Sequence, residues 1–406
     1  MPLLHLRRLT AAAAILLLSS TWAGLAVAQP GLRPAPPDIA AFPARLPNDA
    51  PALEPGVELH GFVAAWVTPW AETSAQNPPD TYRLRFGVLR VDARPARHVS
   101  VLARVGLMLP NSPLLDFALS YTPSDYVGVT VGQFRLPIGA AATTLGPKLV
   151  MLDRPSYVYA MTKQTFREVG VMIHSSERGI GHGVLHYRLM AAGGAGRLGA
   201  PASRPAADLS DSLIAARAIV DFAPLLGWPL RERLALGASY ARSSDPAIAT
   251  GDAARDRELA GSALGRTLAP IQHERVTQLA GADATLQLGP VYAQAELLLL
   301  HSRARAVSER RAGFGTSLDL AYMLPLRPWS LFDLQLASRA EHFNPRLGRA
   351  GESGSNDEVQ LLSLGLNALA GPIRASIFAS FSFFEDAQTQ RRDRASSLTL
   401  RAAASF

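Results

Sequence analysis

The sequence predicts an all-β fold: a transmembrane antiparallel β-barrel of about sixteen strands with long extracellular loops. Three observations predict it. Segments of about ten residues alternate apolar and polar side chains, as strands with two different faces do. The connections between these segments alternate between short and long. Beyond the N-terminus no run of about 20 apolar residues occurs, so helical membrane spans are not expected.

The N-terminus predicts export. Residues 1–28 begin with two arginines, continue through a short apolar run and end in small residues, which is the layout of a cleaved signal peptide. An uncleaved anchor is the alternative. Residues 29–55 are so rich in proline that neither helix nor sheet ladder is expected, and we interpret them as an extended periplasmic segment. The barrel is expected over residues 56–406, and without cysteine it must be stable without disulfides.

The alternation of side chains defines the strands. It is clearest at L-F-D-L-Q-L-A-S-R-A-E-H-F, residues 331–343, where Phe332, Leu334 and Leu336 share one face and polar residues occupy the other. Side chains alternate across a strand, so a period of two separates the faces. The sixteen predicted strands cover residues 57–68, 81–93, 97–109, 113–122, 125–136, 167–175, 183–193, 213–223, 232–242, 274–288, 291–302, 312–324, 331–343, 358–369, 373–385 and 396–406.

The connections favour a membrane barrel over a soluble fold. Those after even-numbered predicted strands are tight, as at Gly289-Pro290, and most of the others are long. In lipid every backbone group must pair, so a sheet spans only as a closed barrel, with short periplasmic turns and long outer loops. Trp228 and Trp329 in tight turns, and Trp70 at the end of the first strand, suit a membrane interface. A soluble periplasmic sandwich or barrel is the alternative.

The stretch T-V-G-Q-F-R-L-P-I-G, residues 130–139, starts as a strand and stops at a proline before a long loop. Together with L-D-R-P at 152–155 and F-R-E-V-G-V-M-I at 166–173, it resembles the phosphate-selective porin O and P family. Outside these blocks only the length, the strand number and the terminal aromatic residue agree. The residues that carry the resemblance are Gly132, Gln133, Phe134, Pro137, Gly139, Arg154, Arg167 and Gly170.

The resemblance implies a trimeric diffusion channel of the bacterial outer membrane, surrounded by lipids and lipopolysaccharide. The third long loop, residues 137–166, is then expected to fold into the lumen as a constriction. Pro137 removes a ladder donor and ends the strand, while Gly132 and Gly139 allow the chain to bend. The final Phe406 resembles the terminal signature that the barrel assembly machinery is expected to read.

Positive side chains are expected to set the selectivity of such a pore. By parity the lumen-facing arginines and acids nearly balance, and an ion pair with an acid of a neighbouring strand is the alternative reading of each arginine. With only two lysines, the chain departs from a family that lines its pore with lysine and arginine clusters, so we expect a weak preference for anions in general, phosphate among them. The candidate constriction residues are Lys148, Arg154, Lys163, Arg167, Arg135 and Gln133, and the candidate pore-lining residues are Arg83, Arg85, Arg104 and Arg188.

Other functions have weaker support. The histidine cluster comprises His174, His182 and His186, but in a strand the last two would lie about 13 Å apart and could not share a metal. No G-x-S-x-G nucleophile elbow occurs. The net charge is +7, but the chain has no basic run and is exported, so nucleic acid is not an expected partner. We therefore expect no enzyme, metal or cofactor; a barrel hydrolase and an adhesin or scaffold barrel remain the alternatives.

Overall fold

The computed structural model describes twelve ranges of the chain. Residues 1–54, with the predicted signal peptide and nearly all of the proline-rich segment, lie outside these ranges, as do Lys163 and Phe406. The described ranges are 55–73, 82–107, 114–144, 148–162, 167–193, 213–229, 232–243, 276–303, 310–326, 332–344, 358–386 and 391–405.

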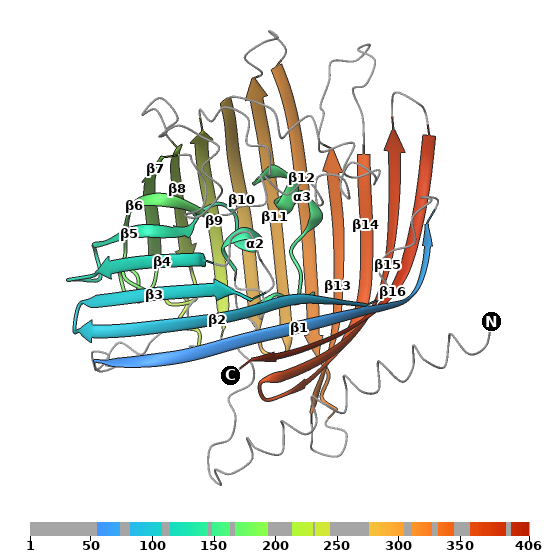
Figure 1. Cartoon of the computed structure of the whole chain (residues 1–406), viewed down its shortest axis with the longest axis horizontal. Helices are drawn as coiled ribbons and strands as arrows, with labels where there is room; N and C mark the ends of the chain where they lie inside the picture. The colour runs from blue at the N-terminus through green and yellow to red at the C-terminus, as the bar shows by residue number, and fades with distance from the viewer. Residues whose placement is uncertain are drawn as a thin grey trace.

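Sixteen antiparallel strands form a closed barrel, in which each strand pairs with its neighbours in sequence and β1 pairs with β16 (Figure 1). This confirms the predicted fold class and strand number. The strands are β1 Gly56–Thr73, β2 Tyr82–Ala96, β3 Val99–Gly106, β4 Leu114–Tyr121, β5 Gly128–Arg135, β6 Arg167–His174, β7 Leu185–Ala192, β8 Leu213–Asp221, β9 Arg233–Ser243, β10 Val276–Leu288, β11 Val291–Arg303, β12 Arg310–Met323, β13 Asp333–Asn344, β14 Glu358–Ala370, β15 Ile373–Asp386 and β16 Arg391–Ser405.

Two short helices, α2 (Ala140–Thr143) and α3 (Ser156–Met161), lie between β5 and β6. In the ranges that the structure describes, no helix has the length and apolar character of a membrane span. The turns after even-numbered strands lie at one edge of the barrel, which we call the tight-turn rim; the connections after odd-numbered strands lie at the opposite edge, the long-loop rim.

The two faces of the wall have opposite compositions. On β9, Arg233 and Ser239 are buried on the inner face, whereas Leu236 and Tyr240 are 50% and 41% exposed on the outer face. The same alternation on the other strands places charged and amide side chains inside. The exposed outer-face residues include Leu119, Val131, Ile173, Leu189, Ile214, Leu297, Leu299, Leu318, Leu320, Leu336, Leu362, Leu364, Ile377 and Phe381.

Gly132 and Gln133 of the stretch 130–139 are built into the wall. The β3–β4 register passes from Asp116 to Leu114, so Leu115 forms a bulge. The Gln133 amide donates hydrogen bonds to the carbonyls of Leu114 (3.0 Å) and Leu115 (2.7 Å), which pairs carbonyl groups beside the bulge. Gln133, expected at the constriction, is instead completely buried in the wall. Gly132 has φ +125°, a conformation that a side chain would strain.

Candidate functional site: the constricted lumen

The connection between β5 and β6 folds into the barrel interior (Figure 1). After β5 ends, the N–H of Ile138 bonds the carbonyl of Leu136 (2.9 Å) around Pro137. Gly139 then adopts φ +61° and leads into α2, whose alanines are buried. We call residues 136–144 and 148–162, the described parts of this connection, the constriction loop. Pro137 and Gly139 thus make the sharp turn that the sequence predicts.

Two wall carboxylates hold the backbone of the constriction loop. Glu296 of β11 accepts a hydrogen bond from the N–H of Ala141 (2.7 Å). Glu341 of β13 accepts from both the N–H and the hydroxyl of Ser156 (2.8 and 2.6 Å), and both carboxylates are buried. Gly139 has φ +61°, which strains a residue with a side chain, and an added Cβ there would lie 2.8 Å from a carboxylate oxygen of Glu296. These contacts fix both loop helices to the wall.

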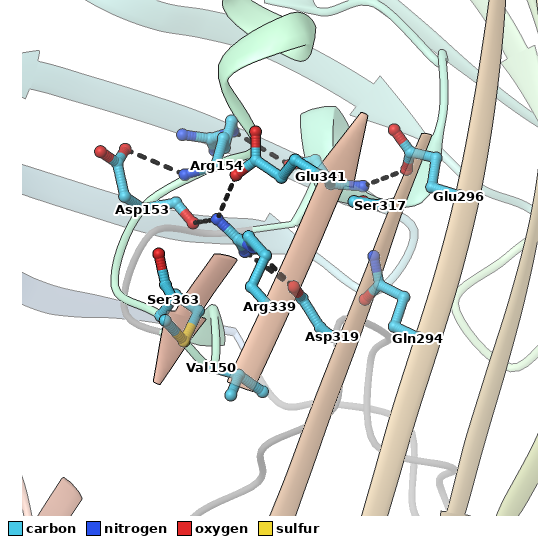
Figure 2. A network of polar contacts seen from close by, with 12 residues as sticks. Val150, Asp153, Arg154, Gln294, Glu296, Ser317, Asp319, Arg339, Glu341 and Ser363 are labelled. Atoms are coloured by element: carbon cyan, nitrogen blue, oxygen red, sulfur yellow. Dashed lines mark hydrogen bonds and ion pairs between the residues drawn. The ribbon is translucent and has the colours of Figure 1, made fainter. Parts of the chain in front are cut away.

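Wall arginines hold the segment between the two helices. The Arg339 guanidinium is ion-paired with Asp319 of β12 at 2.5 Å and also bonds the loop, so it connects two wall strands to each other and to the loop (Figure 2). Because the guanidinium groups of three wall arginines bind backbone carbonyls of the constriction loop, they restrain its position. The bonds run from Arg339 of β13 to the carbonyl of Asp153, from Arg374 of β15 to the carbonyls of Leu149 and Val150, and from Arg401 of β16 to the carbonyl of Met151.

Apolar packing reinforces these bonds at α3. The ring of Tyr157 covers Gly315 of β12, where an added Cβ would lie 2.3 Å from the ring. The Tyr157 hydroxyl contacts the Ser317 hydroxyl at 2.9 Å, and burial raises the pKa of Tyr157, so the phenol stays protonated. Val158 and Met161 of the same helix join a buried cluster with wall residues of β4, β5, β7–β11, β13 and β14. The constriction loop is therefore a packed part of the barrel.

Among the described strands, five buried wall arginines are neutralised by carboxylates, three of them by an acid of an adjacent strand, as the ion-pair alternative expects. Asp116 binds both Arg104 (2.5 Å) and Arg167 (2.7 Å), and all three side chains are buried. Arg104 and Arg167, candidates for solute contact, thus lie within the wall network, where a buried charge must be paired to be tolerated. The other buried pairs are Arg217–Asp283, Arg233–Asp221 and Arg339–Asp319.

Four arginines gather where the constriction loop leaves the wall. Arg135 lies close enough to Arg104, Arg154 and Arg167 for electrostatic repulsion. Arg135 donates to the carbonyls of Thr143 (3.2 Å) and Thr144 (2.7 Å), and Arg154 donates to those of Ala141 (3.0 Å) and Thr144 (2.6 Å). We call Arg104, Arg135, Arg154 and Arg167 the arginine cluster. Both Arg135 and Arg154 are partly accessible, so the cluster presents positive charge to the lumen.

The remaining candidate residues are dispersed. Lys148 is partly exposed on the constriction loop, and no described residue is hydrogen-bonded to it or ion-paired with it. Arg188 is exposed on β7. Arg83 and Arg85 belong to β2, and Arg85 has no register partner on β1. Their side chains are among those that the structure does not describe. Within the described ranges, no three histidine, aspartate or glutamate side chains are grouped to hold a metal.

The anchoring role of Glu296, Glu341 and Tyr157 is not evident from the sequence. The alternation of side chains places the two acids on the lumen face, but their partners Ala141 and Ser156 lie far away along the chain. Glycines on the inner face offered a signal: Gly315 and Gly139 mark places where another group lies against the backbone.

Asp116→Asn should destabilise the barrel by about 3–5 kcal/mol, because it leaves two buried guanidinium groups without a carboxylate. Urea unfolding of refolded protein in detergent measures the change. The matched control is Asp92→Asn, whose partner Arg90 is partly exposed, and we expect about 1 kcal/mol or less there. Equal losses in the two variants would contradict the role assigned to Asp116.

No family model and no curated protein sequence matches the chain. Solved structures do resemble it. OmpT of Vibrio cholerae, in its trimer form, is 9% identical with a TM-score of 0.53, covering 86% of this chain and 99% of that one. The anion-selective porin from Comamonas acidovorans is 10% identical with a TM-score of 0.52, covering 87% and 100%. OprB of Pseudomonas putida, in its high-pH structure, is 9% identical with a TM-score of 0.54, covering 86% and 94%. At these identities the likeness shows the fold alone.

Proposed function

We propose that the chain is an outer-membrane porin, a passive diffusion channel for small hydrophilic solutes with a weak preference for anions. The observation that carries the proposal is the composition of the wall. Large apolar side chains are exposed all around the outer face, while charged and amide groups point inward. A closed barrel with this distribution suits a hydrocarbon surrounding and an aqueous interior. An anion-selective porin is among the structures with a similar fold.

The proposal includes an orientation and a route to the membrane. Residues 1–28 would direct export and be removed, and residues 29–55 would lie in the periplasm beside the tight-turn rim. The long-loop rim would face outward among lipopolysaccharide. Phe406 would be read by the barrel assembly machinery. Homotrimer formation is proposed from the family resemblance, and the fold is similar to that of OmpT in its trimer form.

The constriction loop and the arginine cluster would together set selectivity. Lys148, Arg154 and Arg135 are partly accessible and would meet the solute, whereas Arg104 and Arg167 are buried and would act through their field. Excess positive charge in a narrow lumen raises the local concentration of anions. Guanidinium groups also bind phosphate and carboxylate through paired hydrogen bonds, so phosphate belongs to the proposed solutes. Lys163, in the same connection, is proposed to add to this charge.

Planar-bilayer recording of the purified, refolded barrel tests the proposal. We expect stepwise, long-lived conductance from protein that also shows heat-modifiable gel migration. Folded protein that never conducts would contradict the porin proposal and favour an adhesin or scaffold. Hydrolysis of fluorogenic esters by non-conducting protein would favour a barrel hydrolase instead.

A further inference from the structure

Five charged or titratable side chains form a connected chain on β1 and β2. Glu58 accepts a hydrogen bond from Arg94 (3.1 Å) and lies 3.3 Å from Nε2 of His60. The same Nε2 atom lies 3.8 Å from a carboxylate oxygen of Asp92. Asp92 in turn accepts a hydrogen bond from Arg90 (2.8 Å). We call Arg94, Glu58, His60, Asp92 and Arg90 the mouth cluster, and its imidazole stands between two carboxylates.

The mouth cluster faces the lumen near the tight-turn rim. The β1–β2 register places His60 opposite Arg90 and Glu58 opposite Asp92, and directly opposed residues share a face. Along β1 this is also the face of Phe62, since alternate residues of a strand point the same way. β1 begins at Gly56 beside the tight-turn rim, so the mouth cluster occupies its first turn-proximal positions.

The position of His60 is just beyond the constriction loop. Leu152 of that loop is buried in one cluster with Phe62 and Ala64 of β1. His60 lies two residues nearer to the tight-turn rim, and its side chain is 47% exposed. An ion that has passed the constriction loop therefore meets the mouth cluster before it leaves the barrel at this rim.

The imidazole decides the net charge of the mouth cluster. Two guanidinium groups and two carboxylates balance, and such groups in general keep their charges between about pH 5 and 8, whereas histidine gains or loses a proton in that range. The neighbouring strands add no free carboxylate among the described residues. On β3, Arg104 stands opposite Arg90 and is bound to Asp116 (2.5 Å). On β16, the last described residue is Ser405, opposite Phe62.

We propose that His60 is a proton-controlled selectivity residue at the tight-turn end of the lumen. Uptake of a proton from water at its imidazole changes the net charge of the mouth cluster from zero to +1, and the two carboxylates hold the resulting imidazolium. The added positive charge raises the local concentration of anions and lowers that of cations. The inference rests on the proposed channel function and deepens it, because it names the residue through which pH regulates selectivity.

The other described histidines of the lumen wall have different surroundings. His174 has both ring nitrogens engaged, one with the Ser175 carbonyl (2.7 Å) and one with the Thr130 hydroxyl (2.9 Å). His186 has Arg188 and Arg233 as well as Asp221 among its charged neighbours. Within the described ranges, His60 is the histidine that lies within ion-pair distance of two carboxylates, so we assign the pH response to it.

Reversal potentials in a potassium chloride gradient, measured at about pH 8 and about pH 5.5, test the proposal. A unit charge about 7 Å from the ion path shifts the potential by about one kT in water, and salt screening reduces this, so acidification should raise the chloride-to-potassium permeability ratio about twofold. His60→Gln should keep the lower ratio at both pH values. His60→Lys carries a fixed charge and should keep the higher ratio at both.

The matched control is His98→Gln. His98 is exposed in the turn after β2, at the same rim, and its ring contacts the Thr122 carbonyl (3.1 Å) instead of carboxylates. This variant should respond to pH as the wild type does. Heat-modifiable migration of each variant establishes that it has folded.

The outcomes separate the pH response from the channel itself. A pH-independent ratio in the wild type, or an equal pH response in wild type and His60→Gln, overturns the role of His60 while the porin proposal stands. Loss of the response in His186→Gln with its retention in His60→Gln likewise overturns it and places the titration on β7. A folded wild-type barrel that does not conduct would instead end the proposed function.

Discussion

Replacing residues 137–165 by a tight turn should raise single-channel conductance several-fold. Arg135 and Arg167 are register partners at the ends of β5 and β6, so a turn of about four residues can close the hairpin. The replacement removes both lumenal helices and the segment that wall arginines hold across the interior. Conductance depends on the narrowest cross-section, and the variant widens it. Single-channel recording in potassium chloride measures the change.

A graded variant checks that the anchors matter and not only the length of the loop. Glu296→Gln combined with Glu341→Gln keeps every residue of the loop but weakens the charge-assisted bonds to Ala141 and Ser156. We expect noisier current with brief openings above the wild-type level. If the shortened barrel conducts like the wild type, the loop does not form the constriction, and the geometry of its anchors has no bearing on transport.

Arg154→Glu should turn the proposed weak anion preference into a cation preference. The change removes one positive charge and adds one negative charge within the arginine cluster, beside the constriction loop. The reversal potential in a potassium chloride gradient measures the effect. Arg154→Gln should move it in the same direction by a smaller amount, since it removes the charge only.

Two readouts keep this result interpretable. Arg154 also bonds the carbonyls of Ala141 and Thr144, so a loosened loop would raise conductance as well as alter selectivity. A selectivity change at unchanged conductance therefore reports charge. Arg242→Glu on the outer face is the control and should leave the reversal potential unchanged. A reversal potential of Arg154→Glu equal to that of the wild type would contradict the role given to the arginine cluster.

The barrel was predictable because its wall obeys a local rule. Each strand must present one apolar and one polar face, so side chains alternate with a period of two in segments such as 331–343, of which residues 333–343 lie in β13. Alternation of turn lengths then fixed the strand number and the antiparallel order. The break after β5 was predictable for the same reason, since Pro137 and Gly139 act on their own backbone.

The partners inside the lumen were not predictable, because they depend on which strands come together. Arg217 of β8 binds Asp283 of β10, and the pair passes over β9 at Gly237, where a Cβ would lie 2.5 Å from the carboxylate. Pairing each arginine with an acid on an adjacent strand would miss this contact. Gln133 was misplaced for a similar reason, since the bulge at Leu115 that it serves lies on another strand.

The reversal potential of the wild-type channel in a tenfold potassium chloride gradient tests the central claim most directly. Positive charge around the constriction loop predicts a potential displaced modestly toward the chloride equilibrium value, in channels that open in discrete steps. Displacement toward the potassium value would contradict the account, as would a folded barrel that carries no current.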